Sequence, residues 1–193
     1  MTRVIAGAAG GRRLAVPPGT GTRPTSDRAK EGLFSAWTSL RGTLRGARVL
    51  DLYAGSGAVG LEALSRGAEH VLLVEADPRA ARVVRENVAA LRLPGAEVRT
   101  ARAEKAVTAA PPGPPYDVLF LDPPYDVPGE ELREILLTLL ANDWLAGEAL
   151  VTVERRTRSG EFHWPAGFEG LRSRRYGEAT LWYGRAAEAA AGS

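Results

Sequence analysis

The feature that most constrains the fold is a glycine-rich segment directly after a short apolar run. Residues 49–52 read Val-Leu-Asp-Leu, and residues 55–60 read Gly-Ser-Gly-Ala-Val-Gly, a complete G-x-G-x-x-G pattern. Glu75 ends the next apolar run, twenty residues after Gly55. A strand, a glycine turn, a helix and an acid in this order are typical of a parallel sheet that binds a nucleoside cofactor at its carboxyl edge. The pattern alone does not separate NAD from S-adenosylmethionine.

The rest of the chain continues this alternation of apolar runs and helical patterns. We expect further strands at residues 71–75, around 98, at 117–122 and at 149–154, and a closing hairpin formed by residues 171–176 and 179–183. Helices are expected from about residue 26 with Ala29, Leu33, Phe34, Trp37 and Leu40 on its apolar face, and near residues 59–64, 78–91, 104–110 and 130–140. Nearly all-apolar strands that alternate with helices predict an α/β fold with a parallel sheet covered on both faces.

The length of 193 residues favours one main domain. Residues 3–16 alternate loosely and contain Gly10 and Gly11, so we predict a small hairpin within an N-terminal extension of residues 1–25 that lies outside the main core. The main domain is expected to cover residues 26–185. Residues 186–193 are small, and we expect them to be a disordered tail.

The net charge of +2 conceals a division along the chain. Residues 1–48 carry +7, residues 49–154 carry −8, and residues 155–185 carry +4. Because basic ends around an acidic middle suit a partner rich in phosphates, the pattern favours nucleic-acid binding. The preference for arginine over lysine is also what a GC-rich genome produces, but composition does not explain where the charges lie.

Several classes of protein are disfavoured. The chain has no cysteine, and its two histidines, His70 and His163, lie far apart without a ligand-like pattern, so we expect no metal site. The longest stretch without a charged residue, from Ala106 to Tyr116, is too short to span a membrane. The N-terminus lacks the layout of a secretory signal, and we therefore expect a cytoplasmic protein.

Two features favour S-adenosylmethionine over NAD. Asp51 lies within the first strand, where its carboxylate would attract the ammonium of a methionine moiety and repel a pyrophosphate. The run Asp122-Pro123-Pro124-Tyr125 follows the strand at 117–122, at the edge where such sheets bind ligands. A hydride-transfer enzyme has no use for this run, so a dehydrogenase on the same glycine turn is the less favoured alternative.

The four residues at 122–125 suit methyl transfer to a planar exocyclic amine. The lone pair of such a nitrogen is delocalised into the ring, which makes the nitrogen a poor nucleophile. If Asp122 and the carbonyl of Pro123 accept its two N–H groups, the nitrogen is drawn towards tetrahedral geometry and aimed at the methyl group. Pro123 and Pro124 stiffen the loop, and Tyr125 can stack on a base taken out of its helix.

These motifs resemble those of the S-adenosylmethionine-dependent amino-methyltransferases. The flanking segments at residues 3–7, 11–14, 22–28 and 175–177 are similar to the bacterial family that methylates guanine N2 in 16S ribosomal RNA of the small subunit. The resemblance extends from Arg3 to about Arg185. It implies a Rossmann-like class I methyltransferase sheet of seven strands with the last strand antiparallel, plus an N-terminal hairpin used on RNA. It also implies S-adenosylhomocysteine as the second product and no metal.

The resemblance also implies roles for individual residues. The cofactor-binding residues would be Asp51, Tyr53, Ala54, Gly55, Gly57, Glu75, Ala76 and Ala103, with Glu75 on the ribose. Asp122, Pro123, Pro124 and Tyr125 would be catalytic. The charge division along the chain, and not the resemblance, suggests the RNA-binding residues Arg12, Arg13, Arg23, Arg28, Arg174 and Arg175. One departure concerns Arg102, which stands where the family usually has an acid near the adenine, so that contact would come from the backbone of Ala103 or from Glu104.

The same chemistry leaves the substrate open at this stage. The Asp-Pro-Pro-Tyr motif is also used for methyl transfer to adenine N6 in DNA, and related loops are used for methyl transfer to glutamine in proteins. The basic extension and the lack of a separate target-recognition domain favour small-subunit ribosomal RNA or the assembling 30S particle. A non-catalytic ribosome-assembly factor with this fold is disfavoured because Asp122 is present. We expect a monomer.

Overall fold

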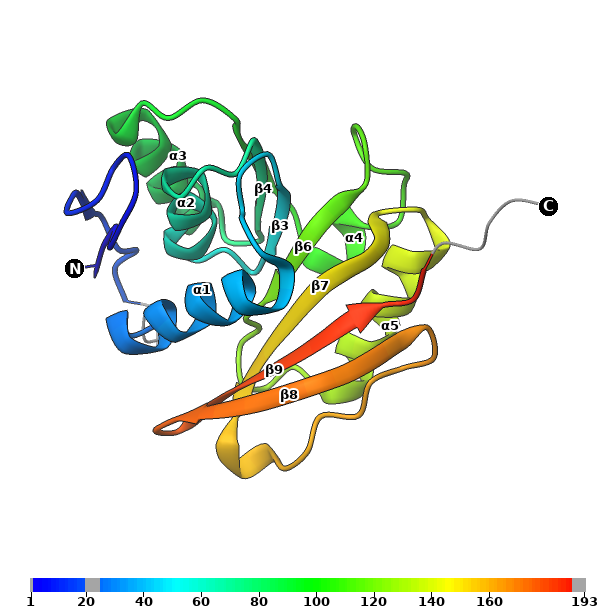
Figure 1. Cartoon of the computed structure of the whole chain (residues 1–193). Coiled ribbons are helices and arrows are strands. Elements are labelled where there is room, and N and C mark those ends of the chain that lie inside the picture. The colour runs from blue at the N-terminus through cyan, green and yellow to red at the C-terminus, as the bar shows by residue number, and fades with distance from the viewer. Residues whose placement is uncertain (1, 20–24, 189–193) are drawn as a thin grey trace.

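The structure, a computed structural model, describes residues 2–19 and 25–188 and is built around a seven-stranded sheet with the order β5-β4-β3-β6-β7-β9-β8 (Figure 1). The strands are β3 (Arg48–Leu52), β4 (His70–Glu75), β5 (Ala96–Thr100), β6 (Tyr116–Leu121), β7 (Leu145–Arg156), β8 (Phe168–Tyr176) and β9 (Ala179–Ala186). Neighbouring strands from β5 to β7 are parallel, whereas β9 is antiparallel to both β7 and β8. The predicted α/β class and the antiparallel last strand are confirmed.

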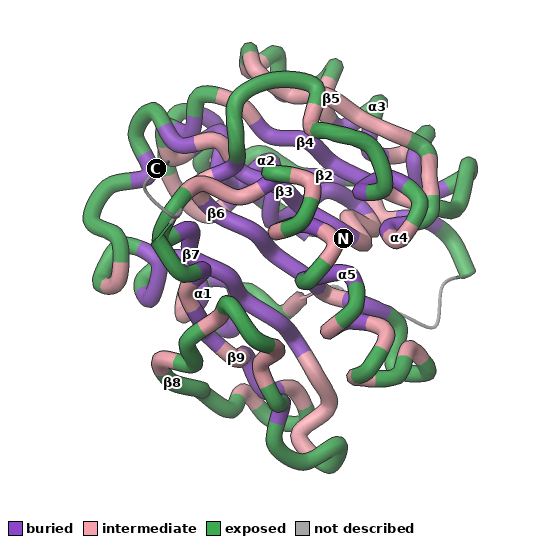
Figure 2. The backbone as a smooth tube through the Cα atoms, turned by 90° about the vertical axis from the view of Figure 1, so that its right-hand side faces the viewer, coloured by how far each residue is buried: buried purple, intermediate pink, exposed green. Residues whose placement is uncertain are grey.

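Helices cover both faces of this sheet. The helices are α1 (Asp27–Arg41), α2 (Ala58–Ser65), α3 (Pro78–Leu91), α4 (Ala103–Ala106) and α5 (Gly129–Ala141), and a 3₁₀ turn covers Thr157–Ser159. One apolar core forms between the sheet and α1, α2 and α3, and a second forms between the sheet and α4 and α5. The central strands are accordingly buried along most of their length (Figure 2).

The helix starts follow the capping signals in the sequence. The Ser26 hydroxyl accepts a hydrogen bond from the Ala29 N–H at 3.1 Å and caps α1. The Asp77 carboxylate accepts from the Arg79 N–H at 2.9 Å and caps α3, with Pro78 at its first position. The expected apolar face of α1 is buried, including Phe34 and Trp37, which are core residues as predicted.

The N-terminal extension packs into the core, so our expectation that it lies outside was wrong. Its hairpin is short, with β1 (Thr2–Arg3) antiparallel to β2 (Arg13–Leu14). The carboxylate of Glu62 on α2 accepts hydrogen bonds from the N–H groups of Ile5 and Ala6 at 2.7 and 3.1 Å. The extension contributes three buried side chains to the core beneath α1 to α3: Val4, Ala9 and Leu14.

Two predicted ends differ from the structure. Helix α4 stops at Ala106 instead of continuing to residue 110, because the following carbonyls bind side chains: Asn142 Nδ2 donates to the Val107 carbonyl at 2.8 Å, and Trp144 Nε1 donates to the Ala109 carbonyl at 2.7 Å. Ala186, which we assigned to the tail, is a buried residue of β9. The rest of the expected tail from residue 189 lies outside the described residues.

Within residues 2–19 and 25–188, no helix combines the length and apolar character needed to cross a membrane. The same part of the chain contains no group of three or more histidine, aspartate or glutamate side chains placed to hold a metal ion.

Candidate active site

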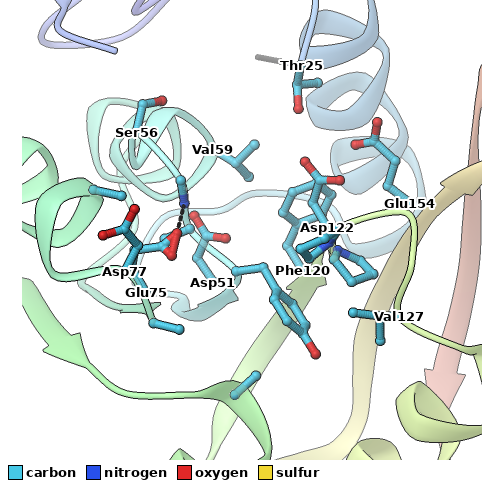
Figure 3. A pocket seen from close by; sticks show the side chains of 18 of the residues that line it. Thr25, Asp51, Ser56, Val59, Glu75, Asp77, Phe120, Asp122, Val127 and Glu154 are labelled. Carbon is cyan, nitrogen blue, oxygen red and sulfur yellow. Dashed lines mark hydrogen bonds between the residues drawn. The ribbon is translucent and has the colours of Figure 1, made fainter. Parts of the chain in front are cut away.

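The predicted cofactor and substrate motifs meet in one pocket at the carboxyl ends of the central strands. β3 pairs with β4 on one side and with β6 on the other, so the strand order reverses here, which is where open α/β sheets bind ligands. The pocket has a volume of about 540 Å³. Asp51 and Glu75 lie on one side of it, and Asp122 and Glu154 lie on the other (Figure 3). A volume of this size suits a nucleoside-sized ligand.

The glycine turn brings the backbone close to the pocket. Gly57 has φ +82°, a left-handed conformation that suits glycine, and it forms the N-cap of α2. A Cβ on Gly60 would lie 2.6 Å from Leu73 Cδ2, so a side chain there would push α2 off β4. The Gly55 N–H donates to Glu75 Oε1 at 3.2 Å and joins the turn to the end of β4. The turn and the acid therefore form one unit.

Asp51 presents a buried carboxyl group to the pocket. The residue is only 1% exposed, and Oδ2 accepts a hydrogen bond from the Gly60 N–H at 3.0 Å. Burial is the main cause that raises the pKa of Asp51 to about 7; the Gly60 hydrogen bond opposes this rise, and the nearby Glu75 adds to it. A cation bound beside Asp51 would favour the charged form, which is what an ammonium group would supply.

The other predicted cofactor residues also line the pocket: Tyr53, Ala54, Gly55, Ala76 and Ala103. Gly57, also predicted to bind the cofactor, does not line the pocket; it is the N-cap of α2. Tyr53 adopts φ 61°, an uncommon conformation for a non-glycine residue, and its hydroxyl has no hydrogen-bond partner among the described residues. A buried hydroxyl without a partner is available to a ligand.

Arg102, the one departure from the family pattern, does not leave an unpaired positive charge in the pocket. Its Nε lies 2.7 Å from Glu104 Oε1, and its side chain is 73% exposed. Ala103 is buried at the start of α4 and lines the pocket between these two residues. Arg102 and Glu104 line the pocket as well, so the arginine enters the lining as one half of an ion pair.

The four predicted catalytic residues form the opposite wall. Asp122 directly follows β6 and is partly buried, and Pro123 is buried behind it. Burial raises the pKa of Asp122 well above its usual range, and the charges of Glu154 and Asp51 add to the effect. Tyr125 is 46% exposed at the mouth, where the Arg156 guanidinium lies 4.2 Å from the centre of its ring. The ring is thus held by a cation on one face.

Glu154 is a site residue that the sequence interpretation missed. It lies near the carboxyl end of β7, lines the pocket and is 9% exposed. Burial raises its pKa to about 7, and contact with the Asp122 carboxyl group opposes the rise. A signal was present, because Glu154 ends the apolar run at 149–154 much as Glu75 ends the run at 71–75.

The N-terminal extension also contributes to the pocket, which the sequence did not indicate. Val16 and Pro17 belong to its lining. Asn87 on α3 holds this segment in place: its side chain accepts from the Ala15 N–H at 2.8 Å and donates to the carbonyls of Ala15 and Ser56 at 3.0 and 2.9 Å. The extension is therefore tied to the glycine turn.

Two of the predicted RNA-binding arginines come together in a groove of about 490 Å³ between α1 and β8. Arg28 lines it from α1, and Arg174 lines it from β8, next to Arg172. The Arg174 guanidinium lies 5.6 Å from the ring centre of Tyr176, which also lines the groove. Residues from opposite ends of the chain thus form one basic surface.

The other predicted RNA-binding residues are placed differently. Arg12 donates to the carbonyl of Leu91 at 3.3 Å and to that of Ala90, so its guanidinium binds the end of α3. Arg13 is exposed on β2 and does not line the pocket or the groove. Arg175 is exposed beside the groove, and its Nε donates to the Gly177 carbonyl at 2.8 Å. Arg23 lies outside the described residues.

Comparisons with known proteins agree with this geometry. Residues 2–185 match the family described as conserved hypothetical protein 95. The chain is 40% identical over 158 residues to ribosomal RNA small subunit methyltransferase D of Escherichia coli, an alignment that covers 82% of this chain and 76% of that protein. The protein of the same name from Haemophilus influenzae is 39% identical over 79% of this chain and 77% of its own length. A solved structure of an Escherichia coli methyltransferase superposes with a TM-score of 0.84 and 35% identity, covering 97% of this chain and 99% of that one.

Proposed function

The chain belongs to the family of ribosomal RNA small subunit methyltransferase D, and on this basis we propose that it transfers a methyl group from S-adenosylmethionine to the exocyclic N2 of a guanine in small-subunit ribosomal RNA. The observation that carries the proposal is that Asp122 lies across the pocket from Asp51 and Glu75, while Pro123, Pro124 and Tyr125, which follow it, line the same pocket. The side of the pocket that contains Asp51, the glycine turn and Glu75 can hold the cofactor and is called the cofactor wall. The side that contains Asp122 can hold the amine that receives the methyl group.

The residues of the first wall fit the cofactor. Glu75 can accept hydrogen bonds from the ribose hydroxyls, the Asp51 carboxylate can pair with the ammonium, and the unpartnered Tyr53 hydroxyl can bind a polar group of the ligand. When bound, S-adenosylmethionine supplies a methyl group already activated on a sulfonium, so the protein needs no covalent intermediate. We therefore propose catalysis by positioning alone, without a metal.

Substitution of Glu75 tests whether the cofactor wall binds S-adenosylmethionine. Glu75→Ala is expected to weaken S-adenosylmethionine binding by about 1–3 kcal/mol, because it removes charge-assisted hydrogen bonds to the ribose. Titration calorimetry measures the dissociation constant directly. Glu86→Ala, an exposed acid on α3, serves as the control. Unchanged affinity in Glu75→Ala would remove Glu75 from the site.

The second wall can activate the guanine amine. We propose that the Asp122 carboxylate and the Pro123 carbonyl accept the two N2–H groups, which directs the nitrogen lone pair towards the methyl group. Tyr125, at the mouth and held by Arg156, is placed to stack on an extruded base. We also propose that the protein acts as a monomer, in the cytoplasm where its RNA substrate is made.

We propose the groove between α1 and β8 as the RNA-binding surface. The supporting observation is that Arg28, Arg172 and Arg174 line one concave surface, and that Thr25, one turn before Arg28, lines the active-site pocket. Arginines favour bidentate contacts with phosphates. An RNA backbone held in this groove would pass close to the pocket.

Charge reversal should test this surface. The double variant Arg28→Glu with Arg174→Glu is expected to lower the slope of log affinity against log salt concentration by about 1 for each phosphate that the protein no longer neutralises. Filter binding of small-subunit RNA across a salt series measures the slope. Lys105→Glu with Arg133→Glu makes the same change of net charge on the opposite face of the sheet and should leave the slope unaltered. Equal slopes in both double variants would place the RNA elsewhere.

The proposed reaction is tested by tritium transfer from methyl-labelled S-adenosylmethionine to unmodified small-subunit RNA and to small subunits reconstituted from it. Nucleoside analysis of the product should find the label in N2-methylguanosine. Label in DNA adenine or in protein glutamine, in parallel reactions that offer DNA or protein instead of RNA, would keep the chemistry and change the substrate. Cofactor binding without any transfer would favour a ribosome-assembly factor.

A further inference from the structure

Glu154 stands out because it is a buried acid with an unsatisfied oxygen inside the active-site pocket. Its Oε2 has no hydrogen-bond partner among the described residues, and the whole residue is 9% exposed. A buried polar atom without a partner is costly, so its presence at a ligand site suggests that a ligand satisfies it.

The sheet places Glu154 directly beside Asp122. β6 and β7 are parallel, and Leu121 is in register with Val153, so the next residue of each strand is Asp122 and Glu154. Neighbouring strands lie about 4.8 Å apart, and both carboxyl groups face the pocket (Figure 3). Two acids at this spacing in a buried site share a proton when no other donor is present. The raised pKa values of both groups agree with this.

A guanine base offers the donors that this pair lacks. Its N1–H and N2–H groups lie side by side on one edge and point the same way, so the edge can donate to two adjacent carboxylates. Adenine instead presents an unprotonated N1 next to its amine, and that lone pair would face a carboxylate. Cytosine also lacks a donor beside its amine. Of the amines in RNA bases, that of guanine therefore fits both acids at once.

We propose that Glu154 is the residue that specifies guanine: its carboxylate accepts the N1–H while Asp122 accepts an N2–H. The inference rests on the proposed function and adds a specificity residue to it. Glu154 lies across the pocket from Asp51 and Glu75, so its task concerns the base and not the cofactor. When guanine binds, its N1–H and N2–H groups take the place of the shared proton. Both carboxyl groups can then be ionised, because each accepts a hydrogen bond from the base.

The test compares two substitutions that differ in their capacity to accept a hydrogen bond. Glu154→Met keeps the length of the side chain and removes the acceptor, whereas Glu154→Gln keeps a neutral acceptor oxygen. Loss of a hydrogen bond to a charged group predicts a fall of about 10- to 150-fold in kcat/KM for Glu154→Met. Glu154→Gln should lie between this variant and the wild type, because charge-assisted hydrogen bonds are about twice as strong as neutral ones.

The measurements are tritium transfer to unmodified small-subunit RNA, the dissociation constant of S-adenosylmethionine, and the thermal midpoint. Glu148→Gln, an exposed acid on the same strand outside the pocket, is the matched control. We expect both Glu154 variants to bind the cofactor within twofold of the wild type and to melt at the wild-type temperature or above. Loss of transfer is then not loss of folding.

Three outcomes would overturn the proposal. If Glu154→Met and Glu154→Gln both transfer methyl groups like the wild type, Glu154 only fills space. If the loss of activity follows a matching loss of cofactor affinity, Glu154 belongs to the cofactor wall. If wild-type protein binds the cofactor but transfers no label to RNA guanine, the proposed function fails, and the guanine contact fails with it.

Discussion

Asp122→Ala should lower methyl transfer to RNA by about 100- to 1,000-fold while leaving the affinity for S-adenosylmethionine within a few-fold of the wild type. The size of the loss is that of removing one group that is pre-positioned for the transition state. The guanine amine has a delocalised lone pair, and without the Asp122 acceptor nothing in the loop after β6 except the Pro123 carbonyl would orient it. Single-turnover rates with saturating cofactor measure the loss.

Folding is not expected to confound this result. Burial, together with the charges of Glu154 and Asp51, raises the pKa of Asp122 in the folded protein, so above the ordinary pKa of aspartate this group makes the folded state less stable relative to the unfolded state. Asp122→Ala should therefore melt no lower than the wild type at pH 7. Asp126→Ala, an exposed acid in the same loop, is the matched control. An Asp122→Ala enzyme with more than a tenth of the wild-type rate would show that another group orients the amine.

The cofactor wall was predictable because its signals are local. A strand, a glycine turn, a helix and Glu75 occur in order within 30 residues, and each element follows from its own sequence. Even the close packing of Gly60 on Leu73 is implied by the motif, since the third glycine is the one that touches the neighbouring strand. The capping residues Ser26 and Asp77 are local signals in the same sense.

The missed features depend on contacts between distant residues. Glu154 was visible as an acid at the end of an apolar run, but its meeting with Asp122 depends on β6 and β7 being neighbours in register. The integration of the N-terminal extension depends on Glu62 and Asn87, which bind its backbone from α2 and α3. Arg12 illustrates the same limit, because only the fold shows that its guanidinium binds the end of α3. Side-chain partners far apart in sequence leave no periodic signal.

The second large effect concerns Asp51, where cofactor binding and stability oppose each other. Its pKa is about 7 in the folded protein against 3.8 ordinarily, mainly because of burial. Between these two pH values the folded state keeps a proton that the unfolded state releases, so this group lowers stability as the pH rises through that window, and the cost is complete above pH 7. Below about pH 4 the side chain is protonated in both states, and the cost vanishes.

Asp51→Asn should therefore stabilise the cofactor-free protein at pH 8 by about 2–4 kcal/mol and leave its stability at pH 4 close to that of the wild type. The amide oxygen can still accept the Gly60 hydrogen bond, so the turn keeps its shape. The same change should weaken S-adenosylmethionine binding at least about 100-fold, because it removes the buried partner of the ammonium. Urea denaturation at pH 4, 6 and 8, with cofactor titration at pH 8, measures both effects. A more stable variant that binds the cofactor normally would show that Asp51 shapes the turn without contacting the ammonium, whereas a variant that is no more stable at pH 8 would contradict the raised pKa itself.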